Sequence, residues 1–167
     1  SAFRMDDCGV LDSTYRLVDR TGRYSGAGGG NITDACMDKD DGVVLVGSFT
    51  SFDGVPAPGM VRLDADGNVD HAFLENLGTG PDGNVTMVRY NKALNKMMVV
   101  GGFEHVNGQP RQQMAMLNPD GTLDGTFVPR EIGGGAVNFA QLIDKEKVIV
   151  SGTFSTYGGV PRLGFLI

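Results

Sequence analysis

The stretch Val46-Gly47-Ser48-Phe49-Thr50-Ser51-Phe52-Asp53-Gly54-Val55-Pro56 occurs three times in this chain with small changes. The second copy reads VGGFEHVNGQP over residues 100–110, and the third reads VSGTFSTYGGVP over residues 150–161. The prolines that end the copies are 54 and then 51 residues apart. A period of this size is typical of repeat architectures, so the repeat decides the fold.

Some positions of this phrase are shared by all three copies. Each copy has a glycine after an apolar run, a phenylalanine two residues later, and a closing proline, and a feature present three times indicates scaffold. The expected structural residues are Gly47, Phe49, Pro56, Gly101, Phe103, Pro110, Gly152, Phe154 and Pro161. The variable loop tips are the expected contact residues for a partner, and these are Phe52, Asp53, His105, Asn107 and Tyr157.

Each repeat also predicts three β-strands. Short β-branched or alternating runs, bounded by turn residues, are typical of strands, and no window shows helical periodicity with caps. The sequence therefore predicts an all-β fold of three repeats of about 54 residues, each with three or four antiparallel strands. The expected strands are 31–37, 43–46 and 59–63, then 84–90, 97–100 and 113–117, then 136–142, 148–150 and 163–167.

A second motif follows the third strand of the repeat. Residues 64–73, DADGNVDHAF, match residues 118–127, NPDGTLDGTF, and residues 2–15 align with 60–73 without a gap. The chain therefore starts in the second half of a repeat and ends in the strand where it began. This permuted frame predicts a propeller-like fold in which the N- and C-terminal segments close one blade, which would hide their sheet edges.

The two motifs together resemble the delta-sixty type of β-propeller repeat. They read (apolar strand)-Gly-x-Phe-Thr-x-x-x-Gly-x-Pro and Arg-Leu-(Asn/Asp)-x-Asp-Gly-x-(Leu/Val)-Asp-x-x-Phe, and they cover nearly all of the chain. The resemblance implies a β-propeller of a family found in bacterial surface or secreted proteins and in phage tail and tail-fibre proteins. Three repeats are fewer than the usual 4–8 blades of a closed propeller.

The expected organisation is a single repeat domain over residues 1–167. Residues 1–30 are a partial closing unit, 31–83 and 84–135 are full repeats, and 136–167 are a repeat completed by the N-terminal segment. Three outcomes are open. Two chains could form a six-bladed ring, one chain could close a trefoil- or prism-like pseudo-threefold unit, or the chain could be part of a longer propeller.

The composition restricts the partners. The 167 residues carry a formal net charge of −6, which argues against nucleic acid as a ligand. No apolar run approaches the ~20 residues of a membrane span, so we expect no membrane insertion. Cys8 and Cys36 match no metal spacing and are expected to be incidental thiols. We expect no cofactor and no metal.

Several motifs suggest a site, but a structural explanation is better for each. Residues 78–83 spell G-x-G-x-x-G, yet a strand follows where a dinucleotide site needs a helix. Asp64-x-Asp66-Gly67-x-x-Asp70 resembles the start of a calcium loop, and a hairpin turn explains it better. Arg4 and Arg62 occupy equivalent positions and are expected to pair with turn aspartates. His71 and His105 lie in no triad or zinc spacing.

The clustered methionines and two sets of equivalent aromatic residues are expected to fill the core. The methionines named are Met87, Met97, Met98, Met114 and Met116, and the aromatic sets are Phe49, Phe103 and Phe154, and Tyr15, Phe73 and Phe127.

No catalytic constellation remains, and we expect a non-enzymatic structural and interaction module. The resemblance favours a virion component of a phage, such as a tail, tail-fibre or baseplate protein, that assembles with itself or other virion subunits, or binds a host glycan or protein. The alternatives are a bacterial extracellular adhesin and, less favoured, a glycan-hydrolysing propeller using a carboxylate pair. The candidate acids for such a hydrolase are Asp34, Glu75, Glu104 and Glu131.

Overall fold

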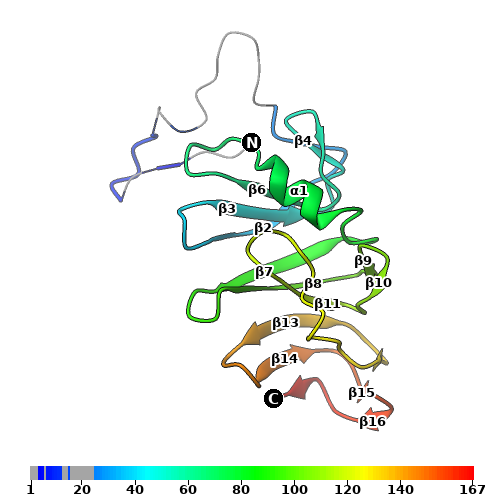
Figure 1. Cartoon of the computed structure of the whole chain (residues 1–167). Helices are drawn as coiled ribbons and strands as arrows, with labels where there is room; N and C mark the ends of the chain where they lie inside the picture. The colour runs from blue at the N-terminus through cyan, green and yellow to red at the C-terminus, as the bar shows by residue number, and fades with distance from the viewer. Residues whose placement is uncertain (1–3, 6, 13–14, 16–24) are drawn as a thin grey trace.

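The computed structural model describes residues 4–5, 7–12, 15 and 25–167. Three similar three-stranded antiparallel sheets stack one on another in chain order (Figure 1). In each sheet the second strand of the repeat lies in the middle, paired with the first and the third. The first sheet comprises β2 (Ile32–Met37), β3 (Val43–Gly47) and β6 (Met60–Leu63), the second β7 (Val85–Asn91), β8 (Lys96–Gly101) and β11 (Met114–Leu117), and the third β13 (Val137–Leu142), β14 (Val148–Gly152) and β17 (Phe165–Leu166).

All nine predicted strands are present at the predicted positions, so the all-β, propeller-like class is confirmed. The three sheets form an open stack, and no closed barrel is present among the described residues.

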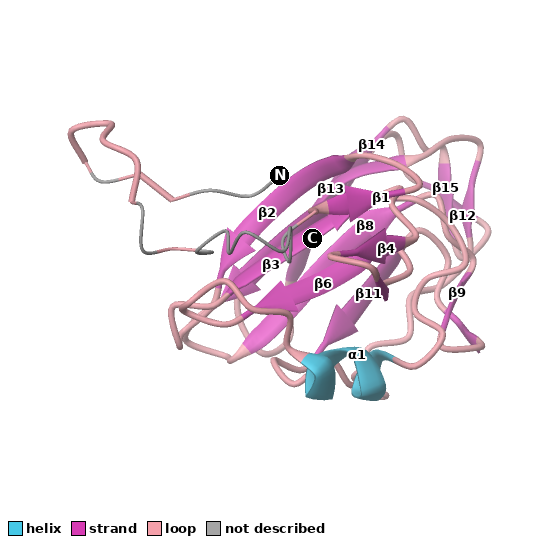
Figure 2. Cartoon of the chain, turned by 90° about the horizontal axis from the view of Figure 1, so that it is seen from above, coloured by secondary structure: helices cyan, strands magenta, loops and turns pink. Residues whose placement is uncertain are grey.

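A small hairpin follows the middle strand of every repeat, and the three hairpins lie on one side of the stack (Figure 2). Their turns are Asp53-Gly54, Asn107-Gly108 and Gly158-Gly159, and both turn residues have positive φ in each. This is the type I′ geometry that favours Asn-Gly and Asp-Gly. The hairpins are β4 (Ser51–Phe52) with β5 (Val55–Pro56), β9 (His105–Val106) with β10 (Gln109–Pro110), and β15 (Thr156–Tyr157) with β16 (Val160–Pro161). β1 (Ala27–Gly28) extends the first hairpin and β12 (Ile132–Gly133) the third.

The repeated glycines allow a close approach between backbones. A Cβ at Gly47, Gly101 or Gly152 would collide with the carbonyl oxygen of Asn31, Asn84 or Ala136, respectively. That carbonyl accepts a hydrogen bond from the backbone N–H of the residue after the glycine, at 2.8–2.9 Å in all three repeats. The glycine is therefore required because the start of the first strand lies too close to the end of the second for a Cβ to fit between them.

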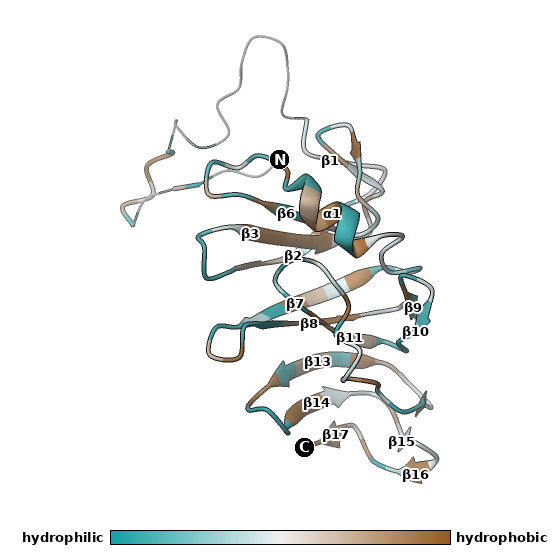
Figure 3. Ribbon diagram, in the orientation of Figure 1, coloured by the Kyte–Doolittle hydropathy of each residue, from teal (hydrophilic) through white to brown (hydrophobic). Residues whose placement is uncertain are grey.

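The two faces of each sheet point to different neighbours. The upstream face of a sheet is defined here by the residues that point toward the preceding sheet, and the downstream face by those that point toward the next. Val44, Val46 and Met60 on the downstream face of the first sheet pack against Val88 and Met97 of the second. Figure 3 shows the apolar residues along β3, β6 and β8, which lie inside the stack. The predicted core methionines and the phenylalanines Phe49, Phe103 and Phe154 are buried.

One helix was not predicted. α1 (His71–Leu77) follows the first sheet, and its N-cap Asp70 accepts a hydrogen bond from the backbone N–H of Phe73. Phe73 and Leu77, four residues apart, are both buried on one helix face. The prediction that no segment is helical is wrong here, because one cap and one apolar pair suffice for two turns that pack on a sheet.

The described ends of the chain lie at opposite ends of the stack. The Arg4 guanidinium donates to the Ala65 carbonyl oxygen in the first repeat, whereas β17 pairs with β14 in the third. The expected pairing of N- and C-terminal segments is therefore not made by the described residues, although Ala2 and Phe3, which belong to the predicted closing strand, lie outside them. Met5 and Leu11 do form the hairpin bridge that Leu63–Val69 and Leu117–Leu123 form.

Candidate functional site

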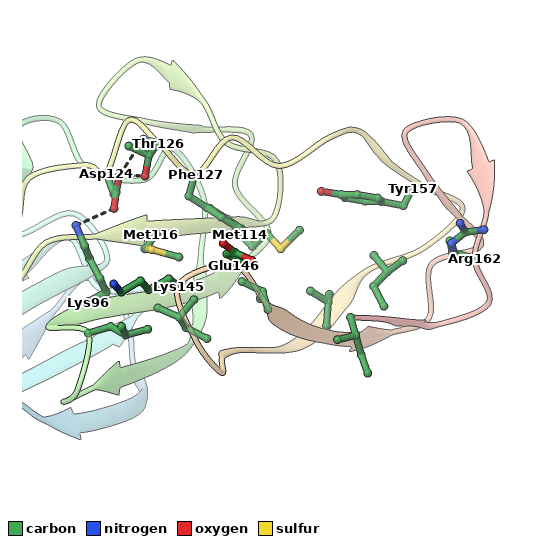
Figure 4. A pocket seen from close by; sticks show the side chains of 16 residues that line it. Lys96, Met114, Met116, Asp124, Thr126, Phe127, Lys145, Glu146, Tyr157 and Arg162 are labelled. Carbon is green, nitrogen blue, oxygen red and sulfur yellow. Dashed lines mark hydrogen bonds and ion pairs between the residues drawn. The ribbon is translucent and has the colours of Figure 1, made fainter.

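An open pocket of about 750 Å³ lies between the second and third sheets (Figure 4). Its apolar wall combines the downstream face of the second sheet with the upstream face of the third. The residues of this wall are Met114, Met116, Leu142, Val148, Val150 and Leu166. Phe127 and Tyr157 are the aromatic residues of the lining, and its charged residues are Lys96, Asp124, Lys145, Glu146 and Arg162.

The pocket is present because the second repeat has no counterpart of α1. Between the first and second sheets, Phe73 and Leu77 of α1 join the buried cluster. In the second repeat Gly125 and Pro129 occupy the positions of His71 and Glu75, and proline in a helix interior removes a hydrogen bond and clashes with the preceding turn. Residues 125–131 therefore run as turn and loop, and the space that a helix would fill stays open.

An ion pair, supported by further hydrogen bonds, lies at one edge of the pocket. Lys96 Nζ lies 2.8 Å from Asp124 Oδ2, and the same carboxylate accepts hydrogen bonds from the backbone N–H and the hydroxyl of Thr126. Burial alone would raise the pKa of Asp124, but the hydrogen bonds from Lys96 and Thr126 outweigh it and lower this pKa to about 2. Asp124 is therefore ionised at neutral pH and is poorly suited to donate a proton.

The aromatic part of the lining includes one predicted contact residue, Tyr157. Its hydroxyl accepts a hydrogen bond from the Arg130 backbone N–H at 3.2 Å, which links the third hairpin to the loop after Phe127. Phe127 is only partly buried, although its counterpart Phe73 is fully buried. An aromatic ring left half-open beside apolar residues is a common feature of small binding sites.

The other predicted contact residues lie apart from the pocket. Phe52 is a correction, because it is fully buried and packs edge to face against Phe49, so it offers no surface to a partner. The Asp53 carboxylate accepts from the Gly26 backbone N–H, and Asn107 Oδ1 accepts from that of Thr79. His105 Nδ1 lies 2.8 Å from Asp82 Oδ2. Their polar groups thus support the hairpins, since an aspartate or asparagine side chain tied to nearby backbone stabilises such turns.

The four candidate acids do not line this pocket. Asp34 accepts hydrogen bonds from the Val88 backbone N–H and the Arg89 guanidinium, so it joins the first sheet to the second. Glu75, Glu104 and Glu131 are exposed on α1, after β8 and before β12. The carboxylates of the pocket are instead Asp124 and Glu146, which the sequence did not single out.

The motif at Asp64 and the equivalent arginines have the structural roles that the sequence predicted. Asp64 Oδ1 accepts from the backbone N–H groups of Asp66 and Asn68, and this builds the hairpin turn. Arg62 donates to Asp38 at 2.6 Å and to Asp70 at 2.7 Å, and Arg4 pairs with Asp12. The arginines therefore do pair with turn aspartates.

In the part of the chain that the structure describes, no group of three or more His, Cys, Asp or Glu side chains could hold a metal ion. No helix among these residues is long and apolar enough to span a membrane. Cys36 is a half-buried thiol, and burial, together with the nearby Asp34 and Asp38, raises its pKa to about 12.

Sequence reasoning missed both α1 and the pocket, although a signal was present. Asp70 is a favourable N-cap residue followed by two apolar residues at helical spacing. The second repeat replaces this segment with one containing Gly125 and Pro129. Comparing the two repeats at these positions would have indicated a helix in the first repeat and an unfilled space beside the sheet in the second.

Comparison with known families gives one result. Residues 39–73 and 95–127 match the family described as "Domain of unknown function (DUF5122) beta-propeller". Both matches run from the turn before the middle strand to the equivalent residues Phe73 and Phe127. They support a β-propeller type of repeat, and the description carries no function. No curated protein and no solved structure matched the chain.

Proposed function

We propose that this chain is a non-enzymatic interaction module that holds an apolar group of a partner in the pocket between its second and third sheets. The observation that carries the proposal is the departure from the repeat. Where the first repeat fills its intersheet space with α1, the second leaves a hollow with an apolar wall, aromatic residues and charged groups at its edge.

The charged groups of the pocket are better suited to orienting a bound ligand than to catalysing a reaction on it. The Lys96–Asp124 pair is a satisfied ion pair with a carboxylate held ionised, whereas a glycosidase needs one carboxylic acid with a raised pKa. Lys145, Glu146 and Arg162 are exposed and can meet a partner of either charge.

The biological setting of the proposal is a virion or extracellular one. It rests on the resemblance of the repeat to phage tail and tail-fibre propellers. In that setting the partner is a host-surface molecule or a neighbouring virion subunit. A bacterial adhesin would use the same pocket, and the genes beside the coding sequence distinguish the two.

The test uses the purified chain on a glycan array and against a displayed peptide library. We expect binders whose signal falls at least tenfold for Phe127→Ala and Tyr157→Ala and is unchanged for Val160→Ser, an exposed apolar position on the third hairpin. Circular dichroism checks that all three variants are folded. Binders that tolerate both pocket variants, or hydrolysis of a bound glycan, would contradict the proposal.

A further inference from the structure

Two Asn-x-Thr sequences occur at equivalent positions of the first and second repeats. They are Asn31-Ile32-Thr33 and Asn84-Val85-Thr86, and each begins one residue before the first strand of its sheet. Asn-x-Thr, with any residue but proline in the middle, is the acceptor sequence for N-linked glycans. A three-residue motif often arises by chance, so the surroundings of each asparagine decide whether it can act as an acceptor.

The side chains of these two asparagines are not used by the fold. Three asparagines, Asn31, Asn84 and Asn138, are exposed, and their side chains make no hydrogen bond to any residue that the structure describes. The other six of the nine use their side-chain amides in hydrogen bonds, and these are Asn68, Asn76, Asn91, Asn95, Asn107 and Asn118. Both asparagines of the Asn-x-Thr sequences therefore present a free carboxamide to solvent.

The third repeat shows that this position does not require asparagine. The backbone carbonyl oxygens of Asn31 and Asn84 accept the hydrogen bond from the residue after the repeated glycine, and the carbonyl oxygen of Ala136 does the same in the third repeat. Alanine has no side-chain amide, so the close approach of the two strands depends on the backbone alone. A group attached to either carboxamide would leave this contact intact.

The threonines of the two sequences, by contrast, are held by the fold. Thr33 Oγ1 lies 2.7 Å from the Val85 carbonyl oxygen, and Thr86 Oγ1 lies 3.2 Å from the Val100 carbonyl oxygen. Both hydroxyl groups are therefore occupied once the sheets have formed. A transferase that recognises the threonine hydroxyl meets it free only in the newly made chain, before the first strand pairs.

We infer that Asn31 and Asn84 are acceptor sites for N-linked glycans. The donor is a sugar whose C1 is activated by a diphosphate, carried on a nucleotide or a lipid. The asparagine Nδ2 forms a bond to C1 and loses one proton, while the bond from C1 to the diphosphate breaks and the diphosphate leaves with the electron pair. The glycans add bulk at the surface without displacing packed residues. Neither asparagine lines the proposed ligand pocket, so either proposal can fail without the other.

Export of the full chain through a secretory pathway that transfers oligosaccharides to Asn-x-Thr, followed by intact mass spectrometry, tests the inference. We expect two glycans on the chain and the loss of one in each of Asn31→Gln and Asn84→Gln. Asn138→Gln is the matched control, because this exposed asparagine has no threonine two residues later, and it should leave the number of glycans unchanged. Fragmentation of the tryptic peptides locates each glycan.

A third site built into the third repeat tests whether the position itself suits a glycan. Ala136→Asn/Asn138→Thr creates the same three-residue sequence there and should add one glycan. The glycosylated chain and Asn31→Gln/Asn84→Gln should have similar urea unfolding midpoints, since neither carboxamide is used by the fold. An exported chain without a glycan at either asparagine would overturn the inference. So would glycans that persist in the double glutamine variant, or a glycosylated chain whose circular dichroism shows that it no longer folds.

Discussion

Lys96 Nζ lies 2.8 Å from Asp124 Oδ2, and this pair in the second repeat replaces the Arg62–Asp70 pair of the first. Met116 stands where Arg62 does, and Lys96 stands where the first repeat has Gly42. A Cβ at Gly42 would lie 2.6 Å from the Arg62 guanidinium. The first and second repeats thus each supply one cation to an equivalent aspartate, but from a different strand.

Removing Lys96 should destabilise the chain. In Lys96→Met the largely buried Asp124 loses its cation, and we expect the free energy of unfolding in urea to fall by about 2 kcal/mol. Lys147→Met, at the equivalent but exposed position of the third repeat, is the control and should change it by less than about 0.5 kcal/mol. The double variant Lys96→Gly/Met116→Arg rebuilds the arrangement of the first repeat and should recover part of the loss. No recovery would mean that the two pairs are not interchangeable.

The same pair makes stability sensitive to acid. The pKa of Asp124 is about 2 in the folded chain and has its ordinary value near 3.8 when unfolded, so the unfolded state binds the proton more tightly. The stabilisation is complete above pH ~4 and is lost as the pH falls toward 2. Urea unfolding between pH 2 and 6 should show wild type and Asp124→Asn converging at the acid end. A constant difference across this range would contradict the assignment.

The repeated glycines can be tested with neighbouring residues. Gly101→Ala places a Cβ against the Asn84 carbonyl and should cost about 1–3 kcal/mol. Gly102→Ala is the matched control, because nothing lies within 4 Å of a Cβ there. We expect that variant to unfold within about 0.5 kcal/mol of wild type. Equal losses in both would show that the close approach at Gly101 is not what requires glycine.

Shortening a buried side chain of α1 should create a cavity between the first and second sheets, similar to the pocket between the second and third. Leu77→Ala removes a side chain that is 1% exposed between the first and second sheets, and we expect a loss of about 2–5 kcal/mol in urea unfolding. Glu75→Ala, on the exposed side of the same helix, should be nearly neutral. A small loss for Leu77→Ala would mean that the sheets tolerate a hollow here as they do beside Phe127.

The strand framework could be predicted from the sequence because its causes are local. Alternation, β-branched runs, Asp-Gly and Asn-Gly turns and the glycine after each middle strand act within one repeat. Positions that recur in all three copies, such as Gly47 and Phe49, also distinguish the structural residues from the variable ones. The pairing of Arg62 with turn aspartates followed from the same comparison of repeats.

The pocket and the exposed faces were decided only by the tertiary structure. Phe52 and Tyr157 hold equivalent hairpin positions, yet one is in the core and the other lines the pocket, because burial depends on what the neighbouring sheet and loop supply. Whether Met60 or Phe165 is covered depends likewise on whether a further sheet packs against its own sheet. Sequence determined the unit and its turns, since these follow from short-range backbone and side-chain preferences. The stacking of the units, a matter of long-range packing, decided which apolar residues remain open to a partner.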